Sequence, residues 1–443
     1  MKLHALVLTL GLVASATASA QDPQPAGTTL EDFFTAAINY SPLLQAARER
    51  WKIGEARIDA ATGQLLPQVS ATANISDNSR TANARRQEFT GERYAVQLSQ
   101  VLFSWQAFEA RRQATLLEGQ NEAEYYAQLA ELLTAVADDY LTALQAEDAL
   151  RSINSELEAT RNQVNQIQQL FNLQLARITD LYDGQARAAA VETRRVDAES
   201  VLTIERANLQ ASSGIAVGGL SRLPDEVTVT PLEGSLEEWL TRAGDNNKRI
   251  EARDYALRAA DRAISQQRGA YLPRVSLVVQ HSTTNTGFDN FPLDRADINY
   301  IGVDVSMPIF AGGSNRAQVR AAESQRNIAE SELRLTSLEV QDRARTAYFQ
   351  IKAGESRIQA AQLLAESTAT AYAAMQRGYE LGTVTSVDVL NALRDQFGAQ
   401  RDLQKARYDL MRWTLVLYRE AGTLSADDMQ RMSEQLNAPP AGP

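Results

Sequence analysis

The sequence contains no cysteine and only two histidines in its 443 residues. The missing thiols exclude a disulfide framework, thiolate metal sites and a lipid-modified cysteine at a processed N-terminus. His4 lies in a segment expected to be removed, so His281 alone is left for the mature chain. Because a histidine-based site cannot be assembled from one ring, we expect no catalytic residues, no metal site and no cofactor, and no enzyme activity.

Long apolar runs and basic tracts are missing as well. Beyond the N-terminus, no segment approaches the roughly 18 apolar residues of a transmembrane helix. The net charge of −11, with no basic tract, argues against a nucleic-acid partner. Residues 1–20 have the pattern of a secretory signal peptide, with an apolar core over 6–14 and the small residues Ala18, Ser19 and Ala20 at its end. We therefore expect export; the alternative is an N-terminal anchor helix.

The chain carries an internal repeat. Residues 29–70 and 235–276 align without a gap at an offset of 206, and the similarity continues after a one-residue slip. A period near 207 residues is too long for a solenoid, whose repeats run about 20–50 residues. Two large copies of one unit indicate a pseudo-symmetric element, such as part of a ring or a channel wall.

Most of the chain has helical periodicity. Leu129, Leu132, Val136 and Tyr140, for example, follow the 3–4 spacing of a helix with one apolar stripe. This pattern predicts coiled-coil-like helices over 30–64, 104–170, 178–212, 236–271, 313–377 and 386–421.

Four short segments alternate with a period of two, which predicts strands: 67–76, 93–102, 273–283 and 300–309. Each is about ten residues long, the length of a transmembrane β-strand. The segments 77–92 and 284–299 between them are polar, and we expect them to be surface loops. Tyr94, Phe103, Tyr300 and Phe310 near the strand ends suit an aromatic girdle or, equally, ordinary packing.

A membrane barrel explains these strands better than two soluble hairpins. A lone hairpin is marginal in water, and its edges would need cover. In a bilayer every backbone group must be paired, so four strands must close with those of other chains. Eight strands would be filled by side chains, whereas twelve or more enclose water, which suits the polar inner faces.

The repeated motifs resemble those of the TolC family of bacterial outer-membrane export channels. The resemblance covers nearly the whole mature chain and rests on the order of several motifs in two copies. These are the junctions Leu66–Ser70 and Leu272–Ser276, the segment Met307–Gly313, and the turns Phe171–Asp180 and Tyr379–Leu390.

The resemblance implies a mainly α-helical fold with a membrane β-barrel. Three copies would contribute four strands each to one twelve-stranded barrel, continued by a long α-helical coiled-coil periplasmic barrel with an internal two-fold repeat. The implied units are a signal peptide over 1–20, a lead-in over 21–29, a helix over 30–66, strands over 67–103, a helical hairpin over 104–212, an equatorial linker over 213–235, then a helix over 236–272, strands over 273–310, a hairpin over 311–421 and an equatorial tail over 422–443, disordered after Leu436.

The resemblance also implies a function. The protein would be a homotrimer in outer-membrane lipid that docks to a periplasmic adaptor and an inner-membrane transporter of the RND or ABC type. It would passively conduct drugs or secreted proteins. The main alternative is a soluble periplasmic coiled-coil scaffold or adaptor, although no lipoyl-like β-domain is visible and the four strands would be unexplained.

In this family the turns of the helical hairpins close the periplasmic entrance. By motif, Asp388 matches the outer ring of a constricting acidic pair, while helix N-capping is the alternative role for Asp180 and Asp388. The sequence departs from the family pattern twice, with Asn391 at the inner acidic position and Val384 where an arginine is usual; nearby Arg177 is a candidate substitute. The predicted gate residues are Arg177, Thr179, Asp180, Tyr379, Val384, Asp388 and Asn391, and Asp304 is predicted to face the barrel lumen.

Overall fold

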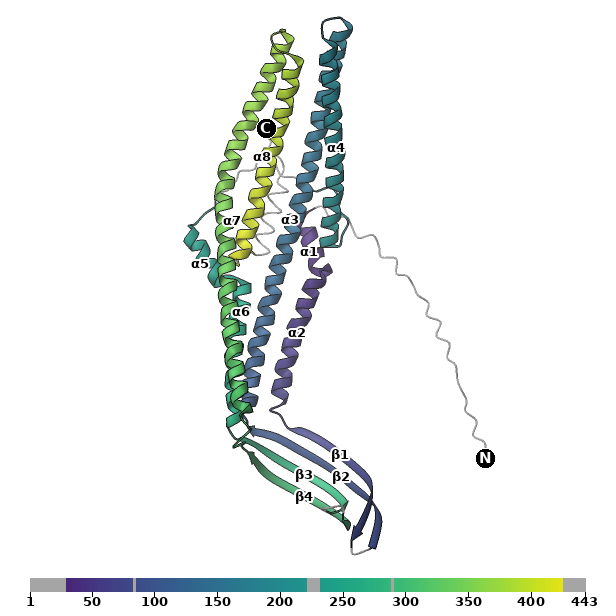
Figure 1. The fold of residues 1–443 in the computed structure, drawn as a ribbon, viewed down its shortest axis with the longest axis vertical. Helices are drawn as coiled ribbons and strands as arrows, with labels where there is room; N and C mark the ends of the chain where they lie inside the picture. Colours follow the sequence, from purple (N-terminus) through teal and green to yellow (C-terminus); the bar gives the residue numbers. More distant parts are fainter. Residues whose placement is uncertain (1–28, 83–84, 221–231, 288–290, 425–443) are drawn as a thin grey trace, which may run out of the picture.

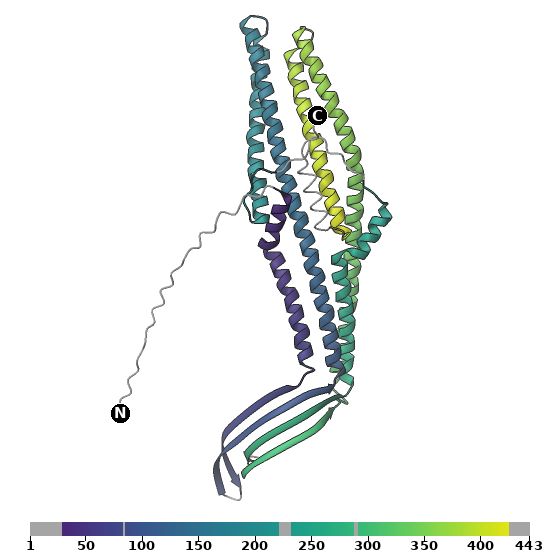
Figure 2. The ribbon, with the colours of Figure 1, turned by 180° about the vertical axis from the view of Figure 1, so that it is seen from behind.

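The computed structural model describes residues 29–82, 85–220, 232–287 and 291–424. The described chain is elongated, with a four-stranded sheet at one end and two helical hairpins pointing away from it at the other (Figures 1 and 2). The predicted signal peptide, most of the lead-in, the middle of the equatorial linker and most of the C-terminal tail lie outside the described residues.

Each repeat contributes four α-helices and two strands. The longest helices, α3 and α7, have 68 and 67 residues and reach about 100 Å at 1.5 Å per residue. α3 packs against α2 and α6 on the side of the sheet and against α4 and α8 on the side of the hairpin turns. The α-helices are α1 (Leu30–Tyr40), α2 (Pro42–Gly63), α3 (Trp105–Asn172), α4 (Ile178–Ser213), α5 (Leu236–Asn246), α6 (Lys248–Arg268), α7 (Ser314–Glu380) and α8 (Ser386–Glu420), with a 3₁₀ turn η1 (Gly269–Tyr271) after α6.

Two predicted single helices are broken, which corrects the prediction for 30–64 and 236–271. Ser41 is extended and caps the amide of Leu44, so α1 ends and α2 begins with Pro42 in its first turn. Asn247 does the same between α5 and α6, and its side chain accepts from two backbone amides. Because proline lacks an amide donor and Asn competes for backbone bonds, both residues suit a helix start.

The sheet is antiparallel, with the order β1 (Gln68–Ala82), β2 (Arg85–Phe103), β3 (Arg274–Thr286) and β4 (Pro292–Ser306). The strands are longer than predicted, and most of the two expected polar loops belongs to them. The prediction failed because polar residues on both faces remove the alternation by which a strand is recognised, while backbone pairing continues.

The register separates an apolar face from a polar one. Val69, Leu98, Val279 and Ile301 form one row across the four strands. The next row is Ser70, Gln97, Gln280 and Tyr300, which therefore lies on the opposite face. Tyr94 belongs to the apolar face and Tyr300 to the polar face, so the two do not share one girdle. The most exposed members of the apolar face are Ile301 at 76%, Val69 at 69%, and Val305 and Ile75, both at 66%.

The apolar face becomes polar toward the hairpin ends of β3 and β4. His281 contacts Asn299 there, with 2.8 Å between Nδ1 and Oδ1. Two residues further along, the hydroxyl of Thr283 donates to Asp297 at 2.6 Å. The apolar band of these strands therefore ends before the strands do.

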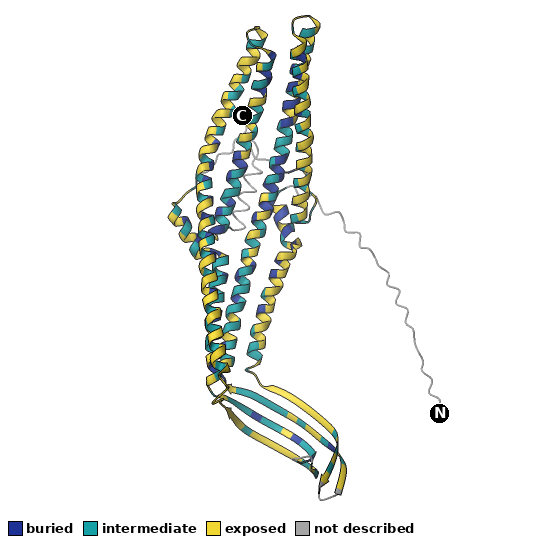
Figure 3. Ribbon diagram, in the orientation of Figure 1, coloured by how far each residue is buried: buried dark blue, intermediate teal, exposed yellow. Residues whose placement is uncertain are grey.

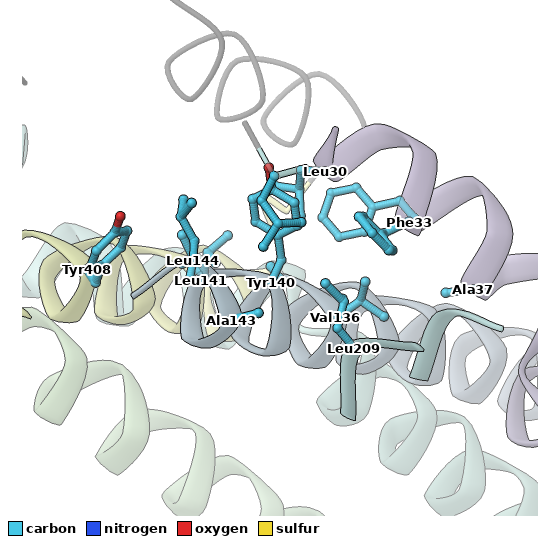
Figure 4. Packing of buried hydrophobic residues seen from close by; sticks show 14 residues of the cluster. Leu30, Phe33, Ala37, Val136, Tyr140, Leu141, Ala143, Leu144, Leu209 and Tyr408 are labelled. Atoms are coloured by element: carbon cyan, nitrogen blue, oxygen red, sulfur yellow. The ribbon is translucent and has the colours of Figure 1, made fainter. Parts of the chain in front are cut away.

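The hydrophobic core lies in the middle of the helical shaft, where α1 packs on α3 and α4 and side chains of α8 complete the cluster (Figures 3 and 4). Phe33 and Tyr140 meet there with ring centroids 5.7 Å apart, and both are fully buried. A second cluster repeats this arrangement around Trp239 of α5 and Ile351 of α7. None of the described helices is both long and apolar enough to cross a membrane.

Candidate functional site at the hairpin tips

The two hairpin turns have the same backbone geometry. Each begins with a residue in the left-handed conformation, Gln174 with φ 63° after α3 and Gly382 with φ 71° after α7. The Leu175 amide then donates to Leu170 O at 2.8 Å, and the Thr383 amide to Gly378 O at 2.9 Å. These bonds satisfy carbonyl groups left over at the ends of the long helices. A side chain is strained at such a position, which glycine avoids.

Asp388 closes the start of α8. Its Oδ2 accepts from the Thr385 amide at 3.0 Å and from the Thr385 hydroxyl at 2.7 Å. The Thr385 hydroxyl oxygen in turn accepts from the Asp388 amide at 3.3 Å, completing a capping box. These bonds to the Thr385 side chain, then its backbone, lower the pKa of Asp388. The carboxylate is exposed, so it caps the helix and remains available to solvent.

The start of α4 is capped differently. Arg177 occupies the N-cap position without a side-chain cap, and its side chain makes no hydrogen bond or ion pair within the described part of the chain. Thr179 is exposed and Asp180 partly buried. Burial raises the pKa of Tyr379 on α7, and the negative charge of Asp180 raises it further, so these two predicted residues lie near each other.

Leucine side chains join the two hairpins near the tip. Leu390 of α8 packs against Ile167 of α3 and Leu181 of α4, and all three are buried. Gly184 of α4 allows α3 and α4 to pack closely beneath this cluster, because a Cβ there would lie 3.2 Å from Val164. Val384, the residue at the position of the usual arginine, instead packs on Gly378, where a Cβ would lie 3.1 Å from its Cγ2.

Arg187 links the hairpins with a polar contact that was not predicted. Its Nη1 donates to Asn391 Oδ1 of α8 at 2.8 Å, and its Nε donates to Asp183 of its own helix at 2.7 Å. The side chain is only 28% exposed. The i,i+4 spacing of Asp183 and Arg187, two turns after Asp180, is the one sequence signal for this site, and it is common on helix surfaces.

A second set of polar contacts joins α3 to α8 higher in the shaft. Glu156, with 1% exposure, accepts from Arg194 of α4 at 2.7 Å and from Arg401 of α8 at 2.8 Å. Tyr408 donates its hydroxyl to Asp148 and is fully buried. The two hairpins of one chain are therefore tied together along the shaft by buried, charge-assisted bonds.

Asp304 lies on the polar face of the sheet. It accepts from the Tyr300 hydroxyl at 3.3 Å, and Gly302 between them leaves room for the ring, since a Cβ there would meet the Tyr300 oxygen. On β3 the same face carries the buried residues Val278 and Ser282. Crowding of this kind is expected on the inside of a curved sheet, which favours the lumen for Asp304.

A family model described as outer membrane efflux protein matches residues 35–215 and 239–423, one match for each repeat. The chain is 27% identical over 411 residues to outer membrane protein TolC of Vibrio cholerae, covering 92% of this chain and 93% of that one. It is 25% identical over 413 residues to the alkaline protease secretion protein AprF of Pseudomonas aeruginosa, covering 90% and 86%.

Solved structures share the fold. The outer membrane protein VceC of Vibrio cholerae superposes with a TM-score of 0.77 at 18% identity, covering 89% of this chain and 96% of that one. The Campylobacter jejuni CmeC outer membrane channel gives 0.75 at 14% identity, covering 99% and 98%. Both the repeats and the whole architecture are accounted for, and the chain belongs to the outer membrane efflux protein family.

Proposed function

We propose that this protein is a trimeric outer-membrane channel that passively conducts drugs or secreted proteins out of the cell. The observation that carries the proposal is the open four-stranded sheet, with an exposed apolar face on one side and a polar face on the other, leading directly into the helical shaft. An apolar face of this kind suits lipid, and a polar inner face suits water. A soluble scaffold would explain neither the exposed apolar face nor the polar face of an open sheet.

The free edges of this sheet support a trimer. β1 and β4 are each paired on one side only, which a bilayer does not tolerate. Three chains close twelve strands, enough to enclose water. The helical edges that continue β4 and β1 also expose apolar side chains suited to a neighbouring copy. On α7 they are Leu335, Leu338, Phe349 and Leu363, and on α2 and α4 they are Leu43, Ile53, Val196, Val201 and Ile204.

The hairpin tips would then form the periplasmic entrance. Three Asp388 carboxylates around one axis repel one another and attract cations. Asn391 leaves the next ring neutral, while Asp180 with Tyr379, and Thr179 beside them, brace the hairpins. Val384 supplies no ionic brace, so we infer an entrance held less tightly than in relatives that carry the arginine.

The family relationship supports a proposal for the partners of the channel. AprF is described as a secretion protein, and BepC of Brucella suis as an efflux protein. For this chain we infer docking to a periplasmic adaptor and an inner-membrane transporter of the RND or ABC type. The transporter would supply the energy, because a passive channel needs neither a catalytic site nor a cofactor.

Single-channel recording tests this function. The purified, folded trimer should give a cation-selective current in planar bilayers, and Asp388→Asn should reduce the selectivity. Thr385→Ala is the matched control, because it removes the Thr385 hydroxyl from the helix cap but keeps the Asp388 charge, and selectivity should persist at neutral pH. A folded trimer without a pore, released from outer membranes by a carbonate wash, would refute the channel.

A further inference from the structure

The few contacts between α4 and α8 near the tip include one polar bond, from Arg187 to Asn391. The guanidinium uses two different nitrogens, Nη1 toward Asn391 and Nε toward Asp183. Asp183 therefore balances the positive charge of Arg187 and leaves Nη1 available for the bond between the hairpins. Asp183 is 41% exposed, so this pair is accessible to water on one side.

Asn391 lies one helical turn after Asp388 on α8, so the two residues share a face. A carboxylate at 391 would add negative charge close to Asp388 and destabilise a closed ring of three chains. Arg187 is placed to cancel that charge. Its effect on closure therefore depends on whether residue 391 is an amide or a carboxylate.

We propose that Arg187 is a latch, a positioning residue that holds α8 against α4 in the closed tip, and that the amide at 391 keeps this latch weak enough to open. The inference rests on the proposed entrance at the hairpin tips. The bond to Asn391 is charge-assisted through its donor alone, whereas Asp at 391 would add the Coulomb attraction of an ion pair, so Asn391 gives the weaker and more reversible contact. Opening the tip breaks one such bond in each chain.

The latch predicts that Asn391→Asp has opposite effects on the opening of the tip with and without Arg187. With Arg187 present, Asn391→Asp forms an ion pair and tightens the tip. In Arg187→Gln, the same Asn391→Asp change adds an uncompensated charge beside Asp388 and opens it. A residue that only fills space would give Asn391→Asp the same effect in both backgrounds.

The test is a double-mutant cycle of Arg187→Gln and Asn391→Asp on the full-length trimer. Open probability is measured in planar bilayers, and hydrogen exchange is measured in the turn segments 171–185 and 379–392. Arg187→Gln should raise the opening equilibrium by roughly tenfold per latch, with faster exchange in both turns. The single variant Asn391→Asp should slow hydrogen exchange in the turns, whereas the same change in the Arg187→Gln background should accelerate it.

Arg195→Gln is the matched control. Arg195 lies on the same helix and pairs with Glu192 and Glu199, so its loss should leave both readouts unchanged. Unchanged exchange in Arg187→Gln, or the same sign of Asn391→Asp in both backgrounds, would overturn the latch. Because exchange does not require a current, a sign reversal in a trimer without a pore would support the latch and refute the channel.

Discussion

The shaft and the tip join the same two hairpins by different chemistry. In the shaft, Glu156 is 2% exposed at its side chain and binds arginines from α4 and α8. Nearer the tip, seven residues or about 10 Å along α4 from Arg194, Arg187 binds a neutral amide and stays partly exposed. Charged groups are costly to separate when buried and cheap to separate when solvated. This difference supports the proposal that the tip opens while the shaft stays closed.

Breaking the shaft should give the largest effect. Glu156→Gln leaves Arg194 and Arg401 facing each other without a buried counter-charge, and we expect a loss of about 3–5 kcal/mol of unfolding free energy. Thermal unfolding followed by circular dichroism measures it. Glu158→Gln, at an exposed position of the same helix, is the control; equal shifts in both variants would mean that the buried site does not hold the shaft.

Tyr408→Phe should weaken the shaft less. It removes one hydrogen bond to the Asp148 carboxylate and no packing, which costs about 1.5–3 kcal/mol. Burial, reinforced by the charge of Asp148, raises the pKa of Tyr408. The hydroxyl therefore remains a donor, and the cost should not vary between about pH 6 and 9. Chemical denaturation at several pH values checks this; a pH-dependent cost would contradict it.

Exchanging the turn residues sharpens the comparison between the two tips. Gln174→Gly relieves a strained left-handed residue, and Gly382→Gln introduces the same strain, each by about 1 kcal/mol in opposite directions. Hydrogen exchange in each turn should slow in the first variant and accelerate in the second. If both variants changed hydrogen exchange in the same direction, the left-handed backbone conformation would not be what determines the stability of these turns.

The smallest expected effect is a shift in titration at the tip. The capping bonds lower the pKa of Asp388 in the folded chain, so the stabilisation they provide is present at neutral pH and is lost only as the pH falls through that lowered pKa. Thr385→Ala removes the largest cause and should move the loss of cation selectivity to higher pH. Reversal potentials recorded on lowering the pH would detect it, and an unchanged midpoint would contradict it.

The helices, the repeat and the position of the turns could be predicted from sequence, because apolar spacing and glycine report on them locally. The strand ends could not. Residues 77–82 and 85–92 are polar on both sides, and they pair because the backbone of the next strand is there, as in Asp77 opposite Thr90. The breaks at Ser41 and Asn247 were missed for a related reason, since the apolar pattern continues across them.

Among the candidate site residues, Asp388 caps α8 and Asp180 lies near Tyr379, while a role for these three in a gate stays a prediction. The contact between Arg187 and Asn391 spans 204 residues along the chain. The sequence does not predict that this arginine and this asparagine are in contact, because helix surfaces offer many similar pairs. Arg177 was the nearer candidate in sequence, yet it lies exposed at the end of its helix.

The sequence by itself determined the period of each element, the two-fold repeat and the alternation that separates a lipid face from a polar one. These depend on residues a few positions apart, whose relation the backbone geometry sets directly. Tertiary structure alone decided how far the strands continue and which charged groups meet across the hairpins. Those outcomes depend on where distant segments lie after packing, since a hydrogen bond or ion pair forms only when both partners have been brought within reach.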